Sequence, residues 1–138
     1  MSDHARNNAD SRARLDRVAK RLTKNIRIDD TWTAAALLAH VAFWDRVAGA
    51  RWEHDPPITV RVDDPIVDLM NAAGLPVWRT LSLADAIREA TDAAAALDEA
   101  IARANAKDIA EATRISVRFV DRSAHRNEHL EQIERVLR

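Results

Sequence analysis

The chain has 138 residues with 21 basic and 22 acidic side chains, so its formal net charge at pH 7 is only −1. No segment concentrates lysine and arginine among aromatic residues, which disfavours nucleic-acid binding. The absence of cysteine excludes disulfides, thiolate metal ligands and a cysteine nucleophile. Because there is no run of about 18 apolar residues and no charged-then-apolar leader, we expect one cytoplasmic domain over residues 1–138 without a membrane segment.

Helical patterns run through most of the sequence, whereas strand signals are nearly absent. We expect residues 1–8 to be flexible and a first helix to cover about residues 9–24. A second helix is expected over about residues 31–50, because Asp29 and Asp30 offer side-chain oxygens of the kind that cap helix N-termini.

A long connection follows the second helix, from Gly49 to about Ser82, and it holds all four prolines of the chain. Asp64 followed by Pro65 predicts one short helix inside this connection, because proline is favoured at the first helical position. The segment ITVRVDD can be extended, but no partner strand is evident.

Two further long helices are expected, over about residues 83–104 and from Ile115 to Leu137. The first of these has the cleanest pattern, since its apolar residues recur on one face at helical spacing. Four long amphipathic helices in one small domain predict an all-α four-helix bundle, in which metal and ligand sites form between facing helices.

Three of the five histidines lie on helix faces that we expect to meet. His125 and His129 are four residues apart, so both imidazoles lie on one face of the last helix. His40 lies on the apolar stripe of the second helix and points toward the helices packed against it. Three imidazole nitrogens with one open position are how catalytic zinc is held. The alternative is that the HxxxH spacing arises by chance and that His40 is a hydrogen-bonded core residue.

Two arginines and a tryptophan are candidates for contacts with a ligand at this site. On a continuous last helix, Arg118 and Arg122 share the direction of the two histidines. A guanidinium there can hold a carboxylate or phosphate through paired hydrogen bonds, unless the helix projects past the bundle and both arginines are solvated. Trp44 can form a wall of the site or belong to the core.

The other polar residues near the histidines are expected at the surface. Asp45 and Asp121 lie off the direction that faces the site, so surface salt bridges are expected for both in place of contacts to a ligand imidazole. Arg126, Asn127 and Glu128 indicate a solvated side of the last helix. Trp32, Trp52 and Trp78 are assigned to packing or to the loop.

The segments that carry the histidines resemble the DinB/YfiT-like superfamily of metal-binding proteins. WTAAALLAHVAFWDRV is similar to the second helix of that superfamily, where a Trp-Ser/Thr start leads to a metal histidine and then to Trp-Asp/Glu. HRNEHLEQIERVL is similar to its last helix, which supplies two histidines four residues apart. The resemblance covers essentially the whole chain in order. It implies that His40, His125 and His129 bind a divalent ion such as zinc or nickel.

The resemblance also implies a metal-dependent transferase that activates a low-molecular-weight thiol, with mycothiol or bacillithiol as co-substrate, for attack on a small electrophile. A bound dication supports this chemistry because it lowers the pKa of a coordinating thiol or water. No catalytic residue beyond the metal ligands is indicated. Three alternatives remain open: a metal-dependent hydrolase that uses water, a non-enzymatic stress or ligand-binding bundle, and a bundle whose packed histidines hold no metal.

We expect a homodimer, because related bundles often dimerise. Exposed tryptophans of the long connection are the candidates for a buried patch between the two copies. The expected ligand is a small molecule, and no nucleic-acid or membrane partner is expected.

Overall fold

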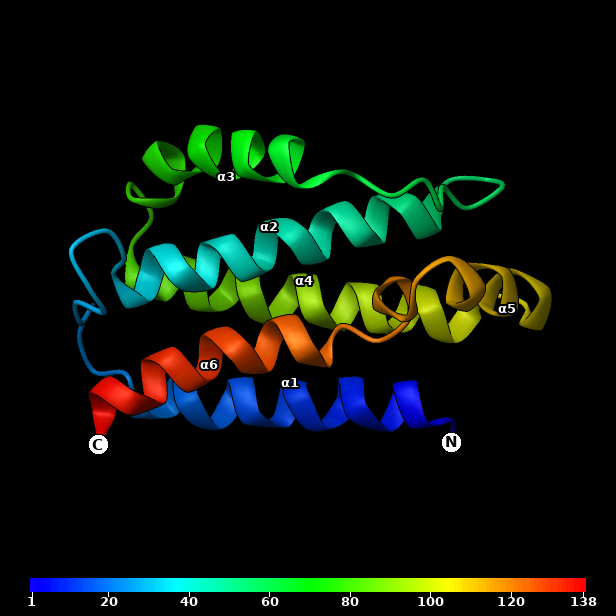
Figure 1. Ribbon diagram of the computed structural model, residues 1–138. Coiled ribbons are helices and arrows are strands. Elements are labelled where there is room, and N and C mark those ends of the chain that lie inside the picture. Colours follow the sequence, from blue (N-terminus) through cyan, green and yellow to red (C-terminus); the bar gives the residue numbers. More distant parts are fainter.

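The computed structural model describes residues 1–138 and is helical throughout, apart from the connections (Figure 1). The elements are α1 (Asp3–Arg21), α2 (Ala34–Glu53), α3 (Asp64–Trp78), α4 (Leu83–Arg103), α5 (Ala106–Ile115), the 3-10 helix η1 (Val117–Phe119) and α6 (Ser123–Leu137). The only β-type pairing is an isolated bridge between Arg27 and Thr33, so the prediction of an all-α fold is confirmed. No helix combines the length and the apolar character that a membrane crossing requires.

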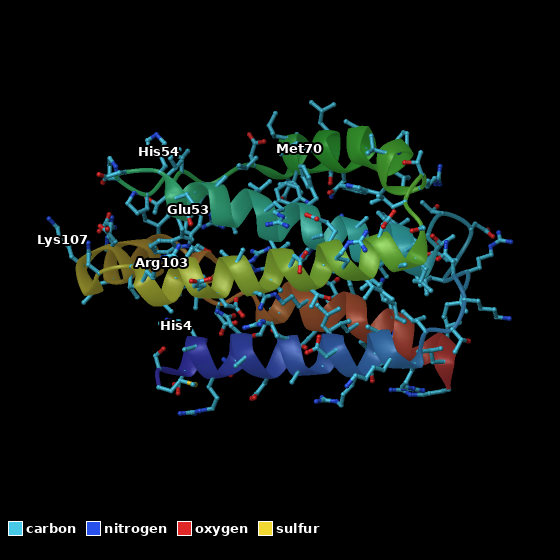
Figure 2. All side chains as sticks on the ribbon, turned by 180° about the vertical axis from the view of Figure 1, so that it is seen from behind. His4, Glu53, His54, Met70, Arg103 and Lys107 are labelled. Atoms are coloured by element: carbon cyan, nitrogen blue, oxygen red, sulfur yellow. The ribbon has the colours of Figure 1, made fainter.

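The helices α1, α2, α4 and α6 pack against one another, and α3 lies along the outer side of α2 (Figure 1). Contacts join α2 with α4, α1 with α6, α1 with α4 and α2 with α6. Figure 2 shows Glu53 and Arg103 near one end of the molecule, where an ion pair of 3.2 Å links α2 to α4. Since α2 contacts α3, α4 and α6, it is the central helix of the fold.

The first half of α2 is buried on all sides. Every residue from Ala34 to Ala42 is buried, and most of them are alanine or leucine. The facing side of α4 contributes Ala86, Ala90, Ala93 and Ala94 to the same core cluster. Because the distance between packed helices depends on the side chains at the contact, these alanines allow the two backbones to lie close together. His40 belongs to this stretch and is therefore fixed on the central helix.

Side-chain caps set where most helices begin. A backbone N–H of the first turn donates to the N-cap side chain of Ser2, Thr33, Asp63, Ser82 or Asn105. Because of the first cap, residues 3–8, which we expected to be flexible, form the first turns of α1. The predicted cap of the second helix is wrong, since Asp29 Oδ1 accepts hydrogen bonds from the N–H groups of Thr31 and Trp32 and closes a turn before α2. The helix expected at Asp64 begins there.

The continuous last helix predicted from Ile115 to Leu137 is wrong, because the structure interrupts it. Ser116 has an extended backbone (φ −162°, ψ 129°), so α5 ends before it, and α6 begins only at Ser123. Between them, Val120 is 1% exposed and anchors the connection in the core. Asp121 Oδ1 accepts hydrogen bonds from the backbone N–H and the hydroxyl of Ser123, at 3.0 and 2.5 Å. These local contacts favour a turn over a continued helix.

Candidate metal centre

The three predicted histidines meet between α2 and α6. His40 Nε2 lies 3.2 Å from His129 Nε2 and 3.3 Å from His125 Nε2. One ligand atom from each residue lies within 4.8 Å of the other two. Nitrogens placed about 2.0–2.1 Å from a tetrahedral ion are separated from one another by about 3.3 Å. The spacing therefore fits a single ion, and the triad can hold a metal.

The second ring nitrogens indicate which side of each imidazole is available. His129 Nδ1 lies 2.7 Å from Gln132 Oε1, which is only an acceptor, so Nδ1 carries the proton and Nε2 keeps its lone pair. Nδ1 of His40 and of His125 is buried without a hydrogen-bond partner. The short distances between the rings join their Nε2 atoms, so Nε2 is the nitrogen that each ring directs toward the other two. Gln132 was not predicted as a site residue, although its position one turn after His129 is a usable signal.

Two tryptophans pack against the ring of His40. Trp32 and Trp78 contact its ring edge-to-face, with centroid distances of 5.4 and 5.2 Å. The ring of Trp78 lies directly over Gly74, where an added Cβ would come within 2.3 Å of Trp78 Cζ2. The assignment of these two tryptophans to packing agrees with the structure. The Nδ1 atom of His40 is buried.

Burial keeps two of the three histidines neutral. It lowers the pKa of His40 from 6.5 to about 4, with a smaller effect of nearby His129. It also lowers the pKa of His125 to about 2, and the positive charge of Arg122 adds to this effect. A metal ion binds the neutral form of imidazole. At pH 7 a metal therefore does not compete with a proton at either ring.

A cavity of about 360 Å³ lies on the open side of the triad. Besides the three histidines, it is lined by Trp44, Val67, Asn71, Arg118 and Arg122. The indole N–H of Trp44 donates to Asn71 Oδ1 at 2.7 Å, which fixes α3 against α2 at this wall. The three histidines thus stand in the wall of a cavity that is large enough for a small molecule.

The arginines reach this cavity by a route that differs from the prediction. Arg118 belongs to η1 and Arg122 is the N-cap residue of α6, so neither shares a continuous helix with the histidines. Arg122 Nε donates to Asp45 Oδ1 at 3.3 Å, and Arg122 Nη1 donates to the carbonyl of Arg118 at 3.4 Å. The fold of η1 brings both residues to the wall of the cavity.

A buried ionic network lies beneath this wall, and it corrects two predictions. Asp45, expected in a surface salt bridge, is fully buried, and Arg126, expected on a solvated side, is 1% exposed. Arg126 Nε donates to Asp45 Oδ2 at 2.8 Å, and its Nη2 donates to Asp98 Oδ1 at 2.9 Å. Its Nη1 also donates to Ser11 Oγ at 3.2 Å. The network joins α1, α2, α4 and α6 at one point.

The expected surface salt bridge of Asp121 is not found either. Its carboxylate accepts hydrogen bonds from Asn7 Nδ2 at 2.9 Å and from Ser123. Burial alone would raise the pKa of Asp121, but these hydrogen bonds lower it. Asp121 therefore orients the first turn of α6 from outside the metal site.

A scan against protein-family models and searches among curated proteins and solved structures find no match to the chain. The resemblance to the DinB/YfiT-like superfamily consequently stays a prediction. The metal site is supported by the spacing and the neutrality of the histidines alone.

The buried network generates a stability prediction. Asp45→Asn should lower the free energy of unfolding by about 3–5 kcal/mol, because Arg122 loses its only carboxylate partner and the buried Arg126 keeps only Asp98. Glu89→Gln is the matched control, since it breaks the Arg46–Glu89 pair (2.7 Å), whose side chains are 46% and 45% exposed. That change should cost about 1 kcal/mol or less. Urea unfolding measures both values, and equal losses would contradict this account of the network.

The neutral histidines generate a pH prediction for the metal-free protein. The folded-state pKa values of His40 and His125 lie below 6.5, so the unfolded chain binds more protons as pH falls below that value. The free energy of unfolding should therefore decrease between pH 7 and pH 5, by at most about 1.4 kcal/mol per pH unit for each histidine. Urea unfolding across this range should show a smaller slope for His40→Gln combined with His125→Gln. An unchanged slope would show that the decrease comes from other groups.

Proposed function

We propose that the protein is a DinB/YfiT-like four-helix bundle that binds a divalent ion, zinc or nickel, and transfers a low-molecular-weight thiol to a small electrophile. One observation carries the proposal: three imidazoles at ion-binding spacing have an open side that faces a cavity. A site of this kind, with three protein ligands and one free position, is typical of catalytic metal centres.

Some residues of the site would hold the ion, and others would contact the ligand. His40, His125 and His129 would supply the three ligand nitrogens, and Gln132 fixes the ring of His129. When bound, the dication lowers the pKa of a thiol or water at its free position. Trp44 forms a wall of the cavity that would receive the ligand.

The absence of cysteine supports an external nucleophile. A chain without a thiol of its own cannot form a thioether or disulfide intermediate, so the sulfur must arrive with a second substrate. We place the protein in the cytoplasm, where small thiols are kept reduced. Water at the same position would make the protein a hydrolase, and the activity test below separates the two reactions.

We also propose a homodimer, although the exposed tryptophans expected to support it are not exposed in the structure. Trp78 is 5% exposed, and the indole N–H of Trp52 donates to the carbonyl of Phe119 at 2.8 Å. The exposed apolar side chains of this region are aliphatic, with Val60 and Leu69 at 72% and 63%. These side chains would form the contact between the copies. A monomer in light scattering at tens of micromolar protein would contradict the homodimer.

Zinc should raise the melting temperature of the metal-free protein, by an amount equivalent to about 2.7 kcal/mol at a concentration 100 times the Kd. His40→Ala should abolish this increase. Gln132→Ala should weaken zinc binding by about 10–100-fold, whereas Gln132→Glu keeps an acceptor for His129 and should bind nearly as well. His54→Ala is the control, because His54 contacts the carbonyl of Pro56 outside the site. Stabilisation by zinc that survives His40→Ala would place the ion elsewhere.

Transfer activity should require both the metal and a thiol. In a reaction with monochlorobimane, a carbon–sulfur bond forms as chloride leaves, and fluorescence measures the product. Mycothiol, bacillithiol and glutathione form the panel, and intact-mass measurement should show no adduct on the protein. His129→Gln should lose turnover together with the ion. Hydrolytic turnover of ester or amide substrates without thiol would favour the hydrolase, and no turnover across broader panels would favour a binding protein.

A further inference from the structure

The cavity at the triad adjoins a second cavity of about 290 Å³. Trp44, Val67, Arg118 and Arg122 stand in the walls of both, so the two cavities are adjacent, and we call their combined space the groove. The groove extends from the histidines of α2 and α6 to the segment that precedes α3. A molecule with one end at the ligand nitrogens has room for a second part farther along this groove.

Positive charge outweighs negative charge along this second part. Four arginines line it, and we call the space the arginine groove: Arg51, Arg61, Arg118 and Arg122. Asp64, in the second cavity, is the only carboxylate among the residues that line either cavity. Of the four arginines only Arg122 makes an ion pair. Its partner, Asp45, also pairs with the buried Arg126. The groove therefore has a local excess of positive charge, although the chain as a whole carries −1.

Two of these guanidinium groups are fixed in place yet keep free donors. Arg51 Nη1 donates to the carbonyls of Ile58 and Val60 at 3.2 and 2.7 Å, and the guanidinium lies 5.2 Å from the ring centroid of Phe119. Its Nε and Nη2 have no partner in the protein. Arg122 is held through Nε and Nη1, and its Nη2 is likewise without a partner. Donors that are already ordered lose little entropy when an anion binds.

We infer that the arginine groove binds the acidic part of the molecule that reacts at the histidines, and that this molecule carries at least two carboxylate or phosphate groups. Guanidinium groups match both kinds of acid through paired hydrogen bonds. A single negative charge would leave part of the local excess uncompensated. That this molecule reacts at the histidines rests on the proposed function. That its acidic groups bind in the arginine groove rests only on the arginines that line it.

The test uses calorimetry on the metal-free full chain with two dianions, succinate and glycerol 3-phosphate, and with neutral succinamide. We expect at least one dianion to bind and succinamide not to bind, and the stronger dianion identifies the preferred acid. Arg61→Gln combined with Arg118→Gln removes two exposed side chains that make no hydrogen bond, so the fold should be retained. This variant should bind the dianion at least tenfold more weakly. Arg17→Gln combined with Lys24→Gln, which removes the same charge elsewhere, should bind as the unchanged protein does.

Each other result would overturn the inference. No binding of either dianion, or equal loss of binding in the two double variants, would show that the groove is not an anion site. Binding that requires added zinc and is unchanged in Arg61→Gln with Arg118→Gln would assign the anion to the ion and not to the groove. A separate zinc titration of the same protein tests the triad, so failure of the groove and failure of the metal site can be told apart.

Discussion

A single buried positive charge, the guanidinium of Arg126, determines how the packed helices fit together. Removing such an ion from water costs several kcal/mol even after the protein relaxes. Burial alone would lower the pKa of Arg126, but Asp45 and Asp98, at 2.8 and 2.9 Å, outweigh burial and raise it. These partners belong to α2 and α4, and Ser11 adds a hydrogen bond from α1. Arg126 reaches all three partners from one position on α6, so the network holds four helices in this arrangement.

The same arrangement positions the candidate metal ligands. His125 immediately precedes Arg126, and His129 follows one turn later, so the contact that orients one face of α6 also directs two imidazoles toward α2. Asp45 contacts Arg126 through Oδ2 and Arg122 through Oδ1. One carboxylate thus connects the interior of the fold with the wall of the cavity. Ligands held by packed helices in this way are ordered before any ion binds, which is what a metal site of defined geometry requires.

The all-α class and the helix at Asp64 could be predicted, because each depends on a cap or a periodicity within a short segment. The meeting of the three histidines spans 89 residues, but it could be predicted because the apolar stripe around His40 and the four-residue spacing of the other two indicate the helix faces on which they lie. The burial of Arg126 and Asp45 could not. A charged residue on one helix indicates solvent unless its partner is known, and these partners are 81 residues apart. Arg118 and Arg122 do line the cavity, yet from η1 and an N-cap position and not from a continuous helix. Hydrophobic periodicity does not reveal the break between α5 and α6. In a sequence, apolar residues that anchor a turn in the core have the same spacing as apolar residues on a helix face.

The walls of the groove come from segments with very different packing. His40 belongs to the stretch Ala34–Ala42, which is buried throughout, so substitutions there disturb the core. The opposite wall includes Arg61 and Val62 from an exposed connection whose neighbouring carbonyls are held by Arg51. Exposed connections tolerate sequence variation far better than cores do. Divergent copies of such a protein could therefore change the molecules they accept while the reacting centre stays constant, because selectivity and chemistry are encoded in separate stretches of the chain.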